Sequence, residues 1–182
     1  MDYTTLFTNL LAIVTLLGNL AAFGLLLFFL IRRSIYDRLM DFLAKWGLEL
    51  GFAISFASTV GSLIYSEVAG FAACILCWIQ RIFMYPLPFL FGLALWKKDK
   101  GVAPYALLLA LVGGAVALYQ WVKDMLALYG NVSLACPEVA GLPSCDKIYV
   151  LEYGYITIPM IALNAFIWLA LITFAALRRA RS

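Results

Sequence analysis

The sequence contains no histidine, and only 13% of its 182 residues are charged. The missing imidazole excludes His-ligated zinc, His-ligated haem and any general acid or base that depends on histidine. Cysteine, carboxylates, tyrosine or a bound cofactor must therefore carry whatever chemistry takes place. The chain has four cysteines, and these are the first candidates.

Hydrophobic residues make up 65% of the chain, and the mean hydropathy is +0.98. Soluble domains contain about 45–50% apolar residues, and a domain of this size has too little interior to bury more. A membrane-spanning helix needs about 20 mostly apolar residues. We predict an all-α protein in the lipid bilayer, with five spanning helices at Thr5–Ile31, Gly47–Tyr65, Cys77–Trp96, Pro104–Trp121 and Tyr155–Leu177.

The first apolar stretch resembles a signal peptide in its position only. It lacks a basic segment before the apolar run, and the run is longer than a signal peptide requires. We therefore expect a retained helix.

Basic residues are concentrated in three short segments, which sets the orientation of the chain by the positive-inside rule. With five spans, all three segments face the cytoplasm, so the N-terminus lies outside and the C-terminus inside. The three segments hold ten of the 13 basic residues: Arg32, Arg33, Arg38, Lys45, Lys97, Lys98, Lys100, Arg178, Arg179 and Arg181.

The segment CILCWIQR places Cys74 and Cys77 at the outer end of the third predicted helix. The partial positive charge at a helix N-terminus and a nearby cation both favour thiolate over thiol. Arg81 follows Cys77 by four residues and shares its helix face. Two interpretations of Arg81 remain open. It anchors the helix at the interface, or it stabilises negative charge on Cys77 or on the oxygen of a bound quinone.

The second pair, Cys136 and Cys145, lies in the long outside segment before the last helix. With Pro137, Gly141 and Pro143 between them, the pair is typical of a surface turn closed by a disulfide. A purely stabilising bond is one interpretation. All four cysteines face the same compartment, so transfer of electrons between the pairs is also possible. Without histidine or a second closely spaced pair, we predict no metal site.

The segment CILCWIQRIFMYP, the loop cysteine pair and the later EYGYITIPMIALNAF together resemble the DsbB family of membrane thiol oxidases, in particular its compact BdbC-type branch. The resemblance covers about residues 47–177. It implies a four-helix transmembrane core at residues 47–182. Residues 1–46 then form one additional N-terminal helix and a cytoplasmic loop.

The resemblance also implies a function, the transfer of electrons from a DsbA-like thioredoxin-fold oxidase to ubiquinone or menaquinone. Cys136 then forms the mixed disulfide with the partner, Cys145 resolves it, and electrons pass to Cys74 and Cys77. Cys77 meets the quinone, and Arg81 binds it. The implied location is the bacterial plasma membrane, with both cysteine pairs outside, and nucleic acid is not among the expected partners.

Two features differ from the family pattern. The helix at Thr5–Ile31 is additional, and Asn19 within it is expected to hydrogen-bond to a neighbouring helix. The loop cysteines are only nine positions apart, closer than in the proteobacterial enzymes. Two alternatives remain. One is a quinone reductase of the vitamin K epoxide type, in which the loop cysteines precede the C-x-x-C helix. The other is a membrane subunit with structural disulfides only.

Overall fold

The computed structural model describes residues 3–99, 101–137 and 139–181. These residues form helices joined by turns, with one isolated bridge between Glu152 and Ile156 and no longer strand pairing among the residues described. The helical elements are α1 (Tyr3–Ile31), α2 (Arg33–Lys45), α3 (Gly47–Leu63), the π-helical turn η1 (Ile64–Val68), α4 (Ile75–Met84), α5 (Pro86–Lys97), α6 (Ala103–Tyr129) and α7 (Ile158–Arg181).

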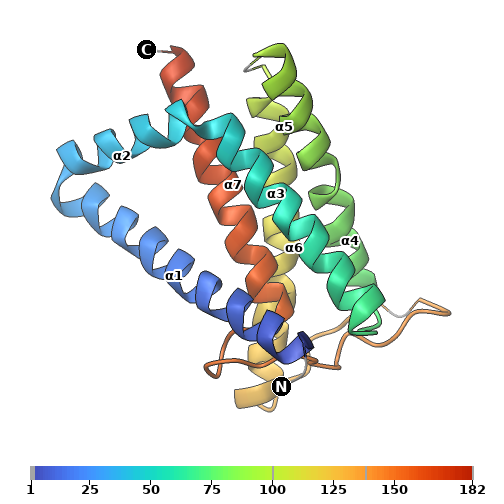
Figure 1. The fold of residues 1–182 in the computed structure, drawn as a ribbon. Helices are drawn as coiled ribbons and strands as arrows, with labels where there is room; N and C mark the ends of the chain where they lie inside the picture. The colour runs from blue at the N-terminus through green and yellow to red at the C-terminus, as the bar shows by residue number, and fades with distance from the viewer. Residues whose placement is uncertain (1–2, 100, 138, 182) are drawn as a thin grey trace.

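Five helical stretches are long and apolar enough to cross a membrane: Tyr3–Ile31, Gly47–Val68, Ile75–Lys97, Ala103–Tyr129 and Ile158–Arg179. The prediction of an all-α membrane protein with a four-helix core and one further N-terminal helix is confirmed. The N-terminus and the segment between α6 and α7 lie at one end of the bundle, and the C-terminus lies at the other (Figure 1).

The centre of the bundle is the pair α6 and α7, which α3, α4 and α5 flank (Figure 1). Phe166 of α7 packs over Gly113 and Gly114 of α6, where the missing side chains leave room for its ring. Phe91 of α5 occupies the corresponding space over Gly51 of α3. Small residues at helix contacts let backbones approach closely, which is the main source of helix association in lipid.

Two local features of the helices bear on the site. The third span is interrupted at Tyr85, because Pro86 begins a new helix at a position where its missing N–H costs least. The fourth span continues as α6 as far as Tyr129. This extension carries Lys123 and Asp124 to the end of the bundle that holds the cysteines.

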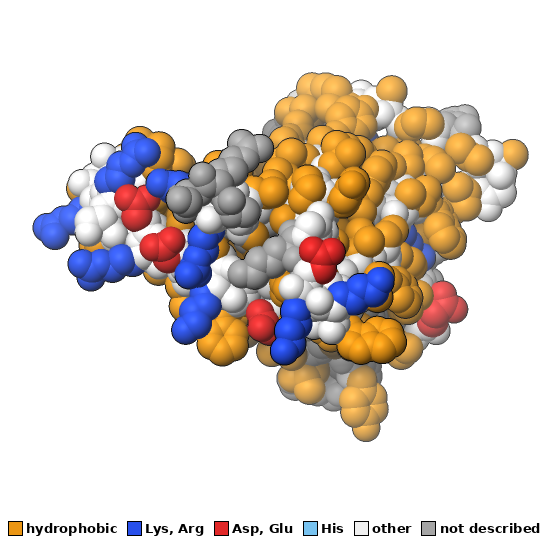
Figure 2. Space-filling model, turned by 90° about the horizontal axis from the view of Figure 1, so that it is seen from above, with side chains coloured by type: hydrophobic (Ala, Val, Ile, Leu, Met, Phe, Trp, Pro, Cys, Tyr) orange, Lys and Arg blue, Asp and Glu red, His pale blue; other side chains and the backbone are white. Residues whose placement is uncertain are grey.

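The connection after the first span, expected as a loop, contains α2. One face of this helix buries Met40, Leu43 and Ala44 against Ile172 and Ala175 of α7. The opposite face is charged. Seen from the C-terminal end of the bundle, lysine and arginine side chains gather on the surface (Figure 2). The basic residues that the structure describes at this end belong to α2 and to the ends of α5 and α7.

Gly51 offers a test of this packing. A methyl group at Gly51 would lie 2.6–2.8 Å from three ring atoms of Phe91, whereas one at Gly24 of α1 would meet nothing within 4 Å. Overfilling a packed core costs about 1–3 kcal/mol. We therefore expect Gly51→Ala to lower the midpoint of thermal unfolding in detergent by about 5 °C. Gly24→Ala should leave it unchanged or raise it slightly. Equal midpoints for the two variants would contradict the packing described.

Candidate active site

The C-x-x-C pair sits at the start of α4. Cys74 is the N-terminal cap, with an extended backbone (φ −73°, ψ 173°), and Cys77 lies in the first turn. The carbonyl of Cys74 accepts the first helical hydrogen bond, from the N–H of Trp78 at 3.0 Å. The two sulfur atoms are 3.3 Å apart, and both cysteines are free thiols. The local fold thus places a dithiol at a helix N-terminus, as the sequence predicted.

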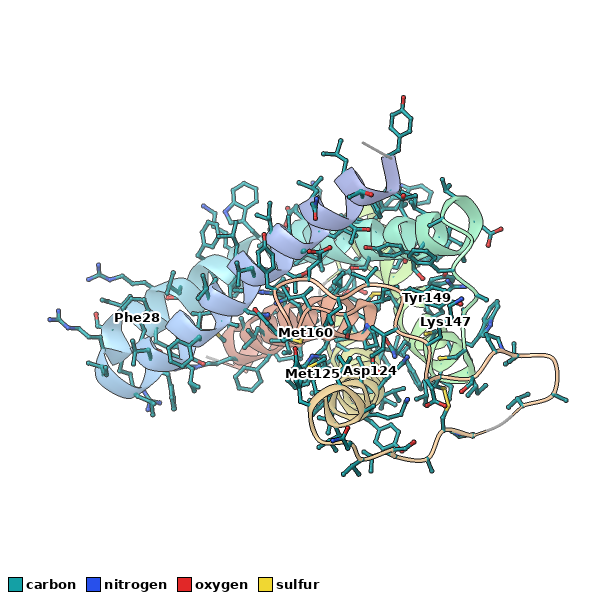
Figure 3. All side chains as sticks on the ribbon, turned by 90° about the horizontal axis from the view of Figure 1, so that it is seen from below. Phe28, Asp124, Met125, Lys147, Tyr149 and Met160 are labelled. Carbon is teal, nitrogen blue, oxygen red and sulfur yellow. A yellow bond between two sulfur atoms is a disulfide. The ribbon has the colours of Figure 1, made fainter. Side chains whose placement is uncertain are left out.

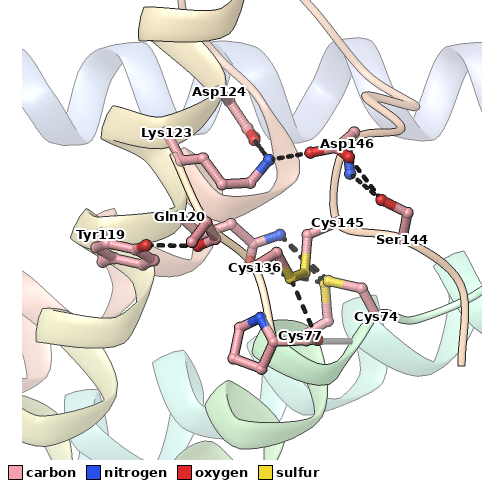
Figure 4. The surroundings of a disulfide bond; sticks show 12 residues. Cys74, Cys77, Tyr119, Gln120, Lys123, Asp124, Cys136, Ser144, Cys145 and Asp146 are labelled. Atoms are coloured by element: carbon pink, nitrogen blue, oxygen red, sulfur yellow. Dashed lines mark hydrogen bonds and ion pairs between the residues drawn. A yellow bond between two sulfur atoms is a disulfide. The ribbon is translucent and has the colours of Figure 1, made fainter. Parts of the chain in front are cut away.

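The loop pair lies directly against this dithiol (Figure 4). Cys136 and Cys145 are joined by a disulfide in the segment that connects α6 to α7. Cys145, only 3% exposed, shares a small buried cluster with Cys74 and Leu76, and Cys136 and Cys77 pack against its edge. All four predicted cysteines therefore meet in one place, although more than 60 residues separate Cys74 from Cys136.

Gln120 of α6 lies beside the dithiol. Its side-chain nitrogen is 3.6 Å from the sulfur of Cys74 and 3.5 Å from that of Cys77. Its oxygen accepts a hydrogen bond of 2.7 Å from Gln80, which lies one turn after Cys77 on α4. Gln120 is 5% exposed. The paired amides fix the orientation of Gln120, so that its N–H groups point at the two sulfur atoms.

The electrostatics of the pair favour a thiolate on Cys74. The pKa of Cys74 is lowered to about 6, first of all by the hydrogen bond from the Cys77 thiol and against the opposing effect of burial. The backbone N–H groups of Cys77 and Leu76 and the amide of Gln120 contribute to the same lowering. At neutral pH the reduced pair therefore carries negative charge on Cys74 at the helix N-terminus.

An ion pair between a buried lysine and an exposed carboxylate connects the loop to α6. Lys123 is 1% exposed, and its ammonium nitrogen lies 2.9 Å from Asp146 and 3.9 Å from Asp124. Asp146 directly follows Cys145. A hydrogen bond from Ser144 and the contact with Lys123 hold the pKa of Asp146 below its usual range. The ion pair therefore fixes the loop disulfide over the end of α6.

The side chain of Arg81 hydrogen-bonds to α3. It donates to Ser62 of α3, from Nε to the hydroxyl at 2.9 Å and from a terminal nitrogen to the carbonyl at 3.1 Å. Its guanidinium lies 5.2 Å from the centre of the Trp78 ring. The hydrogen bonds of Arg81 thus go to α3 rather than to a sulfur atom. Both Arg81 and Cys77 nevertheless line the same cavity.

This cavity has a volume of about 440 Å³, and its lining runs from the helices to the loop that carries Cys145. Its walls are mostly apolar, and the polar groups among them include the dithiol and the Arg81 guanidinium. Pockets for small molecules generally combine these two features. A flat apolar ring with polar oxygens at its edge, such as a quinone, fits this distribution. The lining residues include Ile54, Ser62, Tyr65, Cys77, Arg81, Met84, Ile161 and Phe166.

Comparison with known proteins agrees with the geometry. The family model for disulfide bond formation protein DsbB matches residues 44–177, which include all four cysteines and Arg81. The chain belongs to the DsbB family. Members of this family take part in disulfide bond formation, so the protein is an oxidoreductase of that process in a membrane. No solved structure matches the chain.

Curated relatives carry corresponding names. The chain is 37% identical over 134 residues to "Probable disulfide formation protein C 1" of Bacillus anthracis, covering 74% of this chain and 94% of the relative. It is 34% identical over 131 residues to "Disulfide bond formation protein C" of Bacillus subtilis, covering 72% and 88%. "Probable disulfide formation protein" of Coxiella burnetii is 33% identical over 123 residues, covering 68% and 82%. The match to the DsbB family begins at residue 44, after α1.

Two site residues of this DsbB-family protein escaped the sequence reasoning. Gln120 and Lys123 are polar residues at the outer end of a spanning helix, where they are costly unless partnered. That cost was a signal in the sequence, but it did not identify the partners. In the structure, Gln120 contacts cysteine sulfur and Gln80, and Lys123 contacts carboxylates.

The titration of Cys74 gives the first prediction for the site. The alkylation rate of Cys74 in the reduced protein should rise with pH to a half-maximum near pH 6, because only the thiolate reacts. Gln120→Leu should move this half-maximum to higher pH, because a donor to the anion is lost. Rates are measured with iodoacetamide, and labelled peptides are identified by mass spectrometry. Leu118→Ala, two positions away and 46% exposed on α6, serves as the control. An unchanged profile in Gln120→Leu would exclude a role for the amide.

The ion pair gives a second prediction. Lys123→Met leaves the carboxylate of Asp124 buried without its cation, and loss of one partner of a buried pair costs about 3–5 kcal/mol. Lys147→Met is the matched control, since Lys147 is exposed and lies over the Tyr149 ring at 4.7 Å. This contact contributes about 1 kcal/mol or less. Denaturant unfolding in detergent compares the two variants. Equal losses of stability would show that the ion pair does not hold the loop.

Proposed function

We propose that this protein is a thiol:quinone oxidoreductase that reoxidises a DsbA-like thioredoxin-fold thiol oxidase and passes the electrons to a membrane quinone, either ubiquinone or menaquinone. The observation that carries the proposal is the meeting of the two cysteine pairs at a cavity that Cys77 and Arg81 line. The location that goes with it is the bacterial plasma membrane, with the N-terminus and both cysteine pairs outside and the C-terminus in the cytoplasm.

Exposure distinguishes the two loop cysteines. Cys136 lies at the edge of the sulfur cluster, whereas Cys145 is buried within it. A thiolate of a soluble partner therefore reaches Cys136 first, forms a mixed disulfide with it, and releases Cys145 as a thiolate. This difference supports the partner-binding role proposed for Cys136.

The buried cluster then directs the second exchange. With the C-x-x-C pair oxidised, the Cys145 thiolate attacks Cys74, which it faces in the cluster, and Cys77 leaves as a thiolate. The partner's second thiol displaces Cys136, and the partner departs with a disulfide. The freed Cys136 attacks Cys145, restores the loop disulfide and releases Cys74.

The balance of these exchanges is two electrons moved from the partner to Cys74 and Cys77, with the loop disulfide restored. The structure has this arrangement of bonds, with Cys136 joined to Cys145 and the C-x-x-C pair free. Hydrogen bonds at the helix N-terminus stabilise the charge on Cys74 in this state.

A bound quinone supplies the final oxidation, accepting two electrons and two protons. The chain's own contribution is to hold Cys77 at the wall of the cavity and to exclude water with apolar side chains. Arg81, one turn further along α4, supplies a permanent positive charge at the same wall. If Arg81 turns from Ser62, it loses two hydrogen bonds, and a quinone oxygen can accept hydrogen bonds from it instead.

Cysteine variants test the proposal. Cys77→Ser should abolish oxidation of the protein's thiols by quinone, because the sulfur at the cavity wall is lost. Cys136→Ser should abolish oxidation of a DsbA-like partner but leave the C-x-x-C pair able to react with quinone. Stopped-flow measurements of quinone reduction and electrophoresis of alkylated partner follow the two half-reactions separately.

The visible spectrum with added quinone gives an independent readout. We expect a long-wavelength band in the wild type that is lost in Cys77→Ser. Full turnover in either serine variant would contradict the assigned roles. If quinone oxidises no thiol even in the wild type, the disulfides are structural and the proposal fails.

A further inference from the structure

The N-terminal helix α1 forms one wall of the cavity that contains Cys77 and Arg81. Four of its residues line this cavity: Leu11, Val14, Thr15 and Gly18. The family match begins at residue 44, so α1 is an addition to the part of the chain that the family describes. Neither an anchor nor a packing role explains why it faces the cavity.

On one side, α1 contacts α3 near its outer end. A methyl group at Gly61 would lie 3.7 Å from Phe7 and 3.9 Å from Leu11, which is ordinary van der Waals contact. The Phe7 ring meets the Tyr65 ring edge-on at 5.5 Å between centroids. The Tyr65 hydroxyl lies 3.5 Å from the hydroxyl of Thr8. These contacts join α1 to the end of α3 and to η1.

On the other side, α1 contacts α7 through Asn164. The amide nitrogen of Asn164 donates to the Asn19 side chain and lies 3.4 Å from the Thr15 carbonyl. The predicted hydrogen bond from Asn19 to another helix is thereby confirmed. Gly18 permits this approach, because a methyl group there would lie 2.6 Å from the Asn164 oxygen. In lipid such polar contacts hold helices together with a modest stabilisation of about 1 kcal/mol.

α1 therefore bridges α3 and α7 where those two helices leave a space between them. At the opposite end α3 and α7 touch directly, since a methyl group at Gly47 would lie 3.4 Å from Ile172. Beyond Asn19, α1 leans away from the bundle and reaches α2 (Figure 1). Phe28, near its far end, lies well away from Asp124 and Tyr149 at the site end (Figure 3). The half of α1 that lines the cavity is thus the half that the polar contacts hold.

We propose that α1 is part of the quinone-binding site and determines which quinones the cavity accepts. This inference rests on the proposed function, because it names the cavity's ligand as a quinone. Leu11 is the residue through which α1 limits the room for the ring and its substituents. It lies on the cavity wall and in contact distance of Gly61 on α3. Part of the cavity wall is then formed by α1, which lies outside the residues that match the DsbB family.

Substitutions at Leu11 test the inference. Leu11→Trp should raise the KM for a short-chain benzoquinone about tenfold, because overfilling a packed site costs binding energy of this order. The rate with a saturating concentration of quinone, and the KM for the partner dithiol, should stay unchanged. Leu10→Trp is the matched control, since Leu10 is the adjacent residue, 58% exposed on the outer face of α1.

Leu11→Ala keeps the test informative if the tryptophan variant fails to fold. By enlarging the cavity, it should lower the KM for a bulkier naphthoquinone relative to that for the benzoquinone. A shift of this ratio in Leu11→Ala but not in Leu10→Ala supports the inference. An unchanged ratio contradicts it.

Photolabelling gives a readout that does not depend on activity. An azido-benzoquinone is activated by light in the presence of the wild-type protein, and the labelled peptides are mapped by mass spectrometry. We expect labelling within residues 7–19 as well as 74–85, both suppressed by an excess of unlabelled quinone. Labelling of 74–85 alone, with Leu11→Trp equal to Leu10→Trp, would overturn the role of α1 and leave the proposed function standing. Absence of competed labelling, together with absence of thiol oxidation by quinone, would overturn both.

Discussion

Lipid offers no hydrogen bonds, and this constraint governs the arrangement of the whole bundle. A polar side chain within a span must find its partner on its own helix, as Ser55 and Thr173 do, or on another helix. Gln80 donates a hydrogen bond to Gln120, and Arg81 donates one to Ser62. Asn164 finds Asn19. These pairs join α4 to α6, α4 to α3, and α7 to α1, and all lie toward the end that holds the cysteines. The polar residues thus select which helix faces meet there, while glycine and aromatic packing hold the rest of the bundle together.

The same constraint shapes the chemistry of the sulfur cluster. A dithiol buried at the membrane boundary has few polar neighbours, so the few that it has control its charge. The N-terminus of α4 and the amide of Gln120 both favour an anion on Cys74. Both cysteines line the cavity, but Cys74 is also buried in the cluster with Cys145. The dithiol therefore lies where the loop disulfide and the cavity meet.

The sequence predicted much of this arrangement because hydropathy and charge are local properties. Five spans and the partnered Asn19 could be recognised from composition and spacing. The contact of the Cys136–Cys145 disulfide with Cys74 could not, since no local pattern relates a loop to a helix end across 60 residues of sequence. For the same reason the roles of Gln120 and Lys123 were missed. Their partners belong to other elements, and only the fold brings them within reach.

Arg81 shows why a residue's type and spacing do not fix its contacts. From Cys77 and Arg81 four residues apart, one expects a cation beside a thiolate. In the structure the guanidinium instead donates to Ser62, which offers two acceptors on α3, and leaves the sulfur to Gln120. The cation is thereby kept at the cavity wall, one turn of α4 from Cys77, while a neutral amide donates to the sulfur atoms.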